Sequence, residues 1–445
     1  MKRSTLKRQA VVLIHGIGEQ RPVITLRSFV EAMAQSLKDR KQARLDEVLF
    51  WDKPDPDSGN YETRKMTMRQ GRNHPTTDFF EFYWAHHMRD TNYAHIKDWI
   101  QRVIFRSPSG ISRRLLPVFI FLWLITLAAL IPGGYLAYQY GFTSLFQKLS
   151  TITSGLVVTF ILAFFTKLLF SYLGDAARYL DPSPGNILER KNIRQEGLEL
   201  LRKLHESGKY DRVIIVGHSL GSVIAYDMVK FLWNEYYKTF DPKKFYETYT
   251  GEDKDKLDLL AASEEVSKKL AEGKANVEEF QQSQQQSYEY MRSIGNKWLV
   301  TDLLTLGSPL AHAGHLFVYE KGLFEKLKEQ REYPTCPPRF QKPDTTNIDW
   351  PKTFQVEGVD HPFTLKHLNH SSPFGVTKWT NIYYTSDYIG GPLKDLFGQG
   401  IKDIEVKKPN PMPVYPGGHT EYWTVGNKAN VLTEIWKVLE TPKEE

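Results

Sequence analysis

Hydrophobic residues along this chain gather into short apolar runs that are separated by longer amphipathic stretches. Residues 10–14 (AVVLI), 78–85 (DFFEFYWA) and 213–216 (VIIV) are rich in β-branched and aromatic side chains, which is typical of buried strands. Two further strand-like runs lie at 298–306 and 379–387. Because helical stretches separate these runs, the pattern predicts an α/β fold with a mostly parallel central sheet flanked by helices.

An inserted segment, residues 111–175, interrupts this alternation. It contains two weakly charged stretches, at about 115–138 and 149–171, and the first is long enough to cross a hydrocarbon core of about 30 Å. The pair predicts a transmembrane helical hairpin. Its outer flanks are basic whereas the connecting turn has only Lys148, so the positive-inside rule puts both ends on the cytoplasmic side. A buried helical pair or an apolar lid is the alternative that the prolines and glycines of the segment leave open.

The inserted segment divides the predicted globular domain into residues 1–110 and residues 176–445. The expected protein is therefore a multi-pass membrane protein with two spans and its main domain in the cytoplasm. Within the second part, residues 240–297 form a charged, glutamine-rich stretch. This stretch predicts a helical insertion that is exposed to solvent.

Composition excludes several other classes of protein. The 445 residues are 41% hydrophobic and 25% charged, which is ordinary for a globular protein. A single cysteine, Cys336, excludes internal disulfides. The net charge of +6 is mild, and its basic residues lie near the apolar segments, which suits an anionic membrane surface better than nucleic acid. No zinc-ligand spacing, P-loop or dinucleotide fingerprint is found, so we expect neither a metal nor a cofactor.

The most informative motif is residues 213–221, V-I-I-V-G-H-S-L-G. A strand followed at once by G-x-S-x-G predicts a nucleophile elbow, in which Ser219 lies on a sharp turn into a helix. Gly217 and Gly221, on either side of His218-Ser219-Leu220, lie where a side chain would collide as the strand folds back against the helix. Residues 222–229 carry apolar positions at helical spacing, as that helix requires.

A second glycine-rich turn follows the first predicted strand. Residues 15–18 read His15-Gly16-Ile17-Gly18. Turns of this kind supply one backbone N–H to an oxyanion hole, and the residue after the nucleophile supplies the other. The expected donors are Ile17, or else Gly18, together with Leu220. The alternative is a tight turn that binds nothing.

A serine nucleophile needs a histidine base and an acid to orient that base. His419 is the only histidine beyond residue 370, and Gly417-Gly418 precede it. Asp387 ends the β-rich run 379–387, where a carboxylate can accept the imidazole N–H. Three other aspartates compete less well, because two of them close no clear strand and the third begins one: Asp395, Asp403 and Asp302.

Together these residues resemble the α/β-hydrolase superfamily, and most closely its lipase and esterase branch. The resemblance rests on His15-Gly16, Gly217-His-Ser-Leu-Gly221, Thr305-Leu-Gly-Ser-Pro309, Asp387 and His419. It implies that Ser219 attacks an acyl carbonyl, that His419 takes and returns the proton, and that Asp387 orients His419. It also implies that Ile17 and Leu220 hold the oxyanion. The resemblance does not extend to the predicted hairpin or to the 240–297 insertion.

The expected function is a membrane-anchored serine hydrolase that cleaves acyl esters, either membrane lipids or small molecules, through an acyl-enzyme. Two alternatives stay open: an acyltransferase or thioesterase with the same Ser219-Asp387-His419 triad, and a non-catalytic membrane scaffold with a hydrolase fold. The complete set of candidate residues argues against the scaffold. No motif specifies the acyl chain, the head group or a protein partner.

Overall fold

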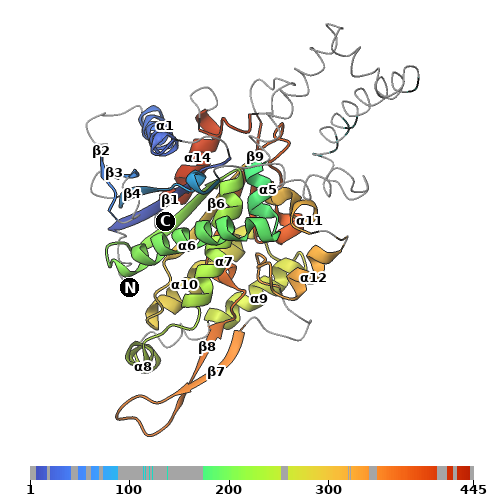
Figure 1. Ribbon diagram of the computed structural model, residues 1–445. Helices are drawn as coiled ribbons and strands as arrows, with labels where there is room; N and C mark the ends of the chain where they lie inside the picture. The colour runs from blue at the N-terminus through green and yellow to red at the C-terminus, as the bar shows by residue number, and fades with distance from the viewer. Residues whose placement is uncertain are drawn as a thin grey trace.

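The structure of the protein is a computed structural model (Figure 1). It describes residues 7–17, 21–41, 49–56, 62–69, 74–88, 174–251, 259–318, 320, 322–339, 348–407, 418–423 and 428–440. Five single positions between these ranges are described as well, namely 114, 116, 120, 123 and 138.

An eight-stranded sheet forms the centre of the protein. Six neighbouring strands of this sheet run parallel to one another, and two antiparallel strands, β3 and β2, extend the sheet at one edge. This arrangement confirms the predicted α/β class with a mostly parallel sheet. In their order across the sheet the strands are β2 (Leu49–Pro54), β3 (Arg64–Arg69), β4 (Thr76–Phe82), β1 (Arg8–Ile14), β5 (Arg212–His218), β6 (Val300–Leu306), β9 (Lys378–Tyr384) and β10 (Lys402–Val406).

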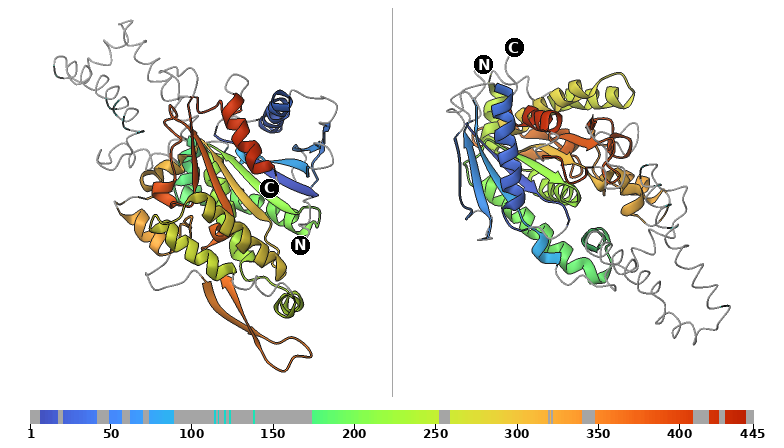
Figure 2. Two further views of the ribbon diagram at one scale, coloured as in Figure 1. Left: turned by 180° about the vertical axis from the view of Figure 1, so that it is seen from behind. Right: turned by 90° about the horizontal axis from the view of Figure 1, so that it is seen from above.

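Helices cover both faces of the sheet (Figures 1 and 2). Successive residues of a strand point to opposite faces, so Val11 and Leu13 of β1 pack on one side and Val12 and Ile14 on the other. The first side is covered by α1 (Ile24–Lys41) and α14 (Lys428–Leu439), and the second by α6 (Ile187–Glu206) and α7 (Leu220–Tyr236). Because α7 is buried nearly all round, it packs as a core helix directly behind the sheet.

The 240–297 insertion is helical, but it is not simply exposed. Its helix α10 buries one face that includes Phe280, Tyr290 and Met291 against the larger core. The amide of Gln284 donates to the backbone carbonyls of Phe374 and Thr377 at 2.7 and 2.9 Å, so this polar side chain fastens the insertion to the domain. The three helices are α8 (Pro242–Thr250), α9 (Leu259–Ala271) and α10 (Val277–Ser293).

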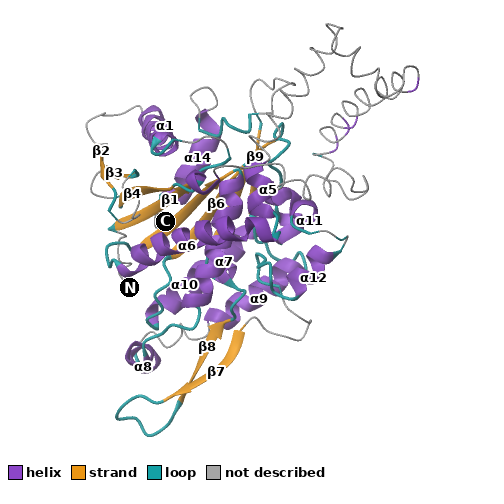
Figure 3. Cartoon of the chain, in the orientation of Figure 1, coloured by secondary structure: helices purple, strands orange, loops and turns teal. Residues whose placement is uncertain are grey.

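A two-stranded hairpin of β7 (Ile348–Phe354) and β8 (Phe363–Leu368) extends away from the main sheet (Figure 3). Several short helices lie in the connections that the structure describes. They are η2 (Ala85–Met88), α5 (Gly174–Leu180), η5 (Pro184–Asn186), η7 (Pro309–His312), α11 (Ala313–Leu316), α12 (Leu323–Glu329), η8 (Pro373–Gly375) and α13 (Lys394–Phe397).

Among the residues that the structure describes, no helix is both long enough and apolar enough to cross a membrane. This finding overturns the localisation predicted from the sequence, and the expectation of a two-span membrane protein with a cytoplasmic domain is wrong. The longest described helices, α1 with 18 residues and α6 with 20, carry charged side chains along their length, whereas a span needs about 20 mainly apolar residues. Apart from the single positions above, the stretches 115–138 and 149–171 lie outside the described residues.

The parallel strands bring distant segments to one edge of the sheet. Because their carboxyl ends meet there, the residues that follow β1, β5, β6 and β9 become neighbours. These are His15-Gly16, Ser219, Gly307-Ser308 and Asp387. All of the sequence motifs except the His419 loop therefore converge for a topological reason.

Candidate functional site

Ser219 lies at a strained turn between β5 and α7. Its backbone has φ 51° and ψ −129°, a conformation that a residue with a side chain rarely adopts and that costs on the order of 1–3 kcal/mol. Hydrogen bonds on both sides hold the turn: the N–H of Ser219 donates to the carbonyl of Leu306, and the N–H of Ser222 donates to the carbonyl of Ser219. The turn lifts the hydroxyl of Ser219 out of the strand at the carboxyl edge of the sheet.

Three glycines make this close approach possible. A Cβ on Gly217 would lie 2.5 Å from the Cα of Ser222, and a Cβ on Gly221 would collide with the carbonyl oxygens of Ile14 and His15. A Cβ on Gly16 would lie 2.8 Å from the Cβ of Ser219 itself. The two glycine motifs of the sequence therefore touch one another at the serine.

Ser219, His419 and Asp387 form one hydrogen-bonded chain. Nε2 of His419 is 2.8 Å from Oγ of Ser219, and Nδ1 is 2.9 Å from Oδ2 of Asp387. A carboxylate only accepts hydrogen bonds, so Nδ1 carries the proton and Nε2 is left to accept from the serine hydroxyl. All three residues are buried. This arrangement can transfer a proton from a hydroxyl to an imidazole that a carboxylate stabilises.

The carboxylate of Asp387 is fully engaged. Oδ1 accepts from the backbone N–H of Ile389 at 2.9 Å, and Oδ2 accepts from the phenol of Tyr422 at 2.8 Å as well as from His419. Burial alone would raise the pKa of Asp387, but its hydrogen bonds and the neighbouring imidazole outweigh burial and lower the pKa below its ordinary value. Asp387 is therefore held in its ionised form.

The three competing aspartates are exposed or bound to other groups, and none of them is hydrogen-bonded to His419 in the described part of the chain. Asp395 is exposed in the first turn of α13. Asp403 accepts from the amide of Asn381 and from the backbone N–H of Leu393 and Lys394. Asp302 is near the amino end of β6, 3.9 Å from the guanidinium of Arg212, and so lies away from the edge that carries Ser219.

The L-G-S-P motif supports both the acid and the elbow. Gly307 has φ 56°, and a Cβ there would lie 2.9 Å from Oδ2 of Asp387; a Cβ on Gly390 would lie 2.7 Å from the same atom. The hydroxyl of Ser308 is 2.6 Å from that of Ser222, which donates to the carbonyl of Ser219. The glycines thus make room for the carboxylate, and the serine braces the nucleophile turn.

Each expected oxyanion donor follows a residue of the serine turn in the chain: Leu220 follows Ser219, and Ile17 follows Gly16, which lies against Ser219. Leu220 is the first residue of α7, and an N–H in the first turn of a helix has no carbonyl to bond within that helix. Its position at the positive end of the helix dipole suits an anion. Ile17 follows Gly16 and packs against the larger hydrophobic core. Gly18, the alternative donor, lies outside the described residues.

His15 is an anchor for its turn and has no contact with Ser219 among the described interactions. Its Nδ1–H donates to the carbonyl of Gly16 at 2.8 Å, its carbonyl accepts from the indole N–H of Trp84 at 2.9 Å, and its ring stacks on Trp84. Burial lowers the pKa of His15 to about 4, although the bond to Gly16 opposes the shift. A neutral His15 therefore fixes the backbone that approaches the serine.

His218, within the elbow, holds the histidine loop. Its Nε2 is 2.8 Å from the carbonyl oxygen of His419 and must donate the proton, because a carbonyl only accepts. The ring also packs edge-on against Trp423. Burial and the neighbouring imidazole of His419 lower the pKa of His218 to about 3, so His218 is neutral at neutral pH, with its one ring proton on Nε2.

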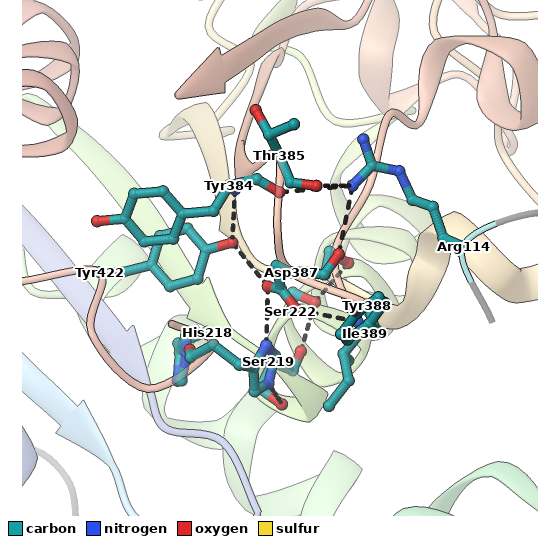
Figure 4. Close-up of polar contacts among 12 residues, drawn as sticks. Arg114, His218, Ser219, Ser222, Tyr384, Thr385, Asp387, Tyr388, Ile389 and Tyr422 are labelled. Atoms are coloured by element: carbon teal, nitrogen blue, oxygen red, sulfur yellow. Dashed lines mark hydrogen bonds and ion pairs between the residues drawn. The ribbon is translucent and has the colours of Figure 1, made fainter. Parts of the chain in front are cut away.

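Arg114 binds the backbone of the loop that carries Asp387. Its Nη1 lies 3.3–3.4 Å from three backbone carbonyls, those of Tyr384, Thr385 and Asp387, and the guanidinium stacks on the ring of Tyr383. Figure 4 shows the side chain reaching this loop from the side opposite Tyr422. His312 adds a bond to the carbonyl of Tyr388 at 3.0 Å.

Sequence reasoning missed the roles of Tyr422, Trp84 and Arg114. Tyr422 is three residues after His419, a separation that a reverse turn spans. This short separation in the chain was a signal that could have placed Tyr422 near the base. Trp84 and Arg114 lie far along the chain from their partners and left no local signal. Comparison of the chain with protein-family models, curated proteins and solved structures gave no match.

Proposed function

We propose that this protein is a serine hydrolase of the α/β-hydrolase type that cleaves acyl esters through an acyl-enzyme intermediate. The observation that carries the proposal is the continuous chain of hydrogen bonds from Ser219 Oγ through His419 to Asp387, with both links between 2.8 and 2.9 Å. These separations lie within hydrogen-bond reach of a nucleophile and its base, about 2.6–3.2 Å. The strained backbone of Ser219, at the end of a parallel strand, supports the same reading.

The proposed reaction steps follow from the positions of the protons on Ser219 and His419 and from the carboxylate of Asp387. His419 Nε2 accepts the proton of Ser219 as Oγ attacks the acyl carbonyl, and the carboxylate of Asp387 stabilises the imidazolium that forms. The N–H groups of Leu220 and Ile17 would bind the oxyanion. His419 then gives the proton to the leaving alkoxide, and a water molecule, activated by the same imidazole, releases the acid.

The order of the three residues along the chain, Ser219, Asp387 and His419, is the order of the α/β-hydrolase family. Helices on both sides of the mostly parallel sheet also suit that fold. We propose acyl esters as the substrate class, because a serine hydroxyl paired with an imidazole and a carboxylate is suited to attack an acyl carbonyl.

Hydrolysis of p-nitrophenyl acetate and butyrate tests this proposal. We expect the native protein to release p-nitrophenol and Ser219→Ala to lose at least about 10³-fold in kcat. Ser207→Ala is the matched control, because Ser207 precedes β5 and so lies toward the opposite edge of the sheet. An inactive native protein, or a Ser219→Ala variant as active as the native one, would rule out this function. Ester turnover only in the presence of an added alcohol acceptor would instead indicate acyl transfer.

A further inference from the structure

A second cluster of reactive side chains lies near the turn that carries Gly16. His86 and His87 are in η2, directly after β4, and Glu196 is on α6. Nε2 of His87 is 2.9 Å, and Nε2 of His86 is 3.6 Å, from the same oxygen, Oε2 of Glu196. One ligand atom from each of the three residues lies within 4.8 Å of the other two.

These separations fit a metal ion. In a tetrahedral zinc site with bonds of 2.0–2.1 Å, neighbouring ligand atoms are about 3.3 Å apart. The two nitrogen-to-oxygen separations in the cluster lie on either side of that value, so small side-chain rotations suffice to reach it. The donor set, two imidazoles and one carboxylate, is one that zinc binds in proteins, with water completing the coordination.

A simple ion pair explains the cluster less well. The rings of His86 and His87 are only 3.9 Å apart between centroids, and Nε2 of both rings lies near the same oxygen of Glu196. An ion pair with Glu196 requires only one of these imidazoles. A divalent cation accounts for both, because it binds two imidazoles and a carboxylate together.

Packing contacts hold the two histidines and the helical turn that carries Glu196, whose side chain is half-exposed. The ring of His86 stacks on Tyr83 at an interplanar angle of 15°, and the N–H of His87 donates to the carbonyl of Trp84. Glu196 is next to Gly197 on α6, and a Cβ on Gly197 would lie 2.8 Å from the sulfur of Met228 on α7. The turn that carries Glu196 therefore packs closely on α7. A site built on two such elements loses little conformational entropy when it binds an ion.

We propose that His86, His87 and Glu196 bind one zinc ion that ties η2 to α6. The bound ion would also brace the oxyanion turn, since Trp84, which donates to the carbonyl of His15, lies in the same segment as His86. This inference goes beyond the proposed hydrolysis and does not depend on it. The sequence led us to expect no metal, because adjacent histidines and a glutamate from a distant helix form no ligand-spacing motif.

Zinc titration of the chelator-stripped full chain tests the proposal. With zinc chloride and a competing fluorescent chelator, we expect one ion per chain, together with a rise of a few degrees in Tm at saturating zinc. His87→Asn and Glu196→Gln should each weaken zinc binding by more than about 100-fold, which exceeds the roughly 10–100-fold effect of losing an outer hydrogen-bond partner.

Two further variants make the result specific. His361→Ala removes an exposed histidine beside β8 and should leave the affinity unchanged. Ser219→Ala should also bind zinc as tightly as the native chain, which separates this proposal from the proposed function. Failure of the native chain to bind zinc would overturn the inference. So would equal affinities for the native chain, His87→Asn and Glu196→Gln, because the ion would then lie elsewhere.

Discussion

The phenol of Tyr422 donates a 2.8 Å hydrogen bond to Oδ2 of Asp387, the same oxygen that accepts from Nδ1 of His419. The phenol oxygen in turn accepts from the backbone N–H of Tyr384 at 3.1 Å. Tyr422 therefore connects the end of β9 to the acid and lies three residues after His419 in the chain. It fixes the carboxylate in the orientation that the imidazole requires.

We expect Tyr422→Phe to lower kcat for p-nitrophenyl esters by about 10-fold or more, because a hydrogen bond to a charged group contributes about 1.5–3 kcal/mol. The ring should still fill its place, so the fold is kept. Initial rates and circular dichroism of the two proteins measure these effects. Unchanged kcat would show that the phenol does not position the acid.

Asp387→Asn should reduce kcat by about 10⁴-fold while the protein stays folded, because an amide can donate to His419 and favour the wrong tautomer. Asp395→Asn is the control, since this aspartate is exposed on α13. Ester hydrolysis by purified variants of equal Tm measures the effect. If Asp395→Asn alone inactivates, Asp387 is not the catalytic acid.

Arg114→Ala should loosen the loop of Asp387, because three carbonyls lose their common donor. We expect faster amide hydrogen exchange in residues 384–390, a lower kcat and little change in KM. Arg114→Lys should recover only part of the activity, since an ammonium cannot reproduce the planar guanidinium. The comparison variant is Arg202→Ala, which breaks an exposed pair with Glu235. Exchange that is equally fast in both variants would contradict the proposed clamp.

Glu81 predicts a pH dependence of stability. Burial raises its pKa from 4.5 to about 7, although backbone N–H groups of Val23 and Leu26 partly oppose the shift. Because the folded pKa exceeds the unfolded one, the contribution to stability is fully present below pH 4.5 and is lost as the pH rises through 7. Above pH 7 the folded protein must hold a buried carboxylate.

Glu81→Gln should therefore be more stable than the native protein at pH 8.5, by on the order of 3 kcal/mol at most. The advantage should shrink toward pH 5. Urea unfolding of both proteins at pH 5, 7 and 8.5 measures this difference. A difference that stays constant across this range, or that grows toward low pH, would contradict the raised pKa.

The residues of the candidate site could be predicted where a short stretch of sequence determines the local backbone structure around them. The run 213–221 specifies a strand, a strained serine and a helix within nine residues, and the end of the β-rich run 379–387 identified Asp387. Tyr422, His218 and Arg114 act through contacts between segments distant in sequence or through single hydrogen bonds. Neither kind of contact leaves a periodic signal.

The parts of the fold that were predicted wrongly show what hydropathy and charge leave out. Residues 240–297 are charged enough to suggest an exposed helix, yet α10 buries Phe280 and Tyr290 and uses Gln284 as an internal fastening. The burial of α10 depends on the surface that it packs against, which the composition of the segment does not specify. The membrane localisation expected from the hydropathy of 115–138 is contradicted because no described helix can cross a membrane.

Reaction with a fluorophosphonate tests the central claim most directly, because such probes bond covalently to a serine that an adjacent base activates. We predict one adduct per chain by intact mass, located by peptide mapping on Ser219 and absent from Ser219→Ala. His419→Ala should also react far more slowly. A native protein that stays unlabelled beside a reactive control hydrolase, or an adduct that persists in Ser219→Ala, would contradict the account.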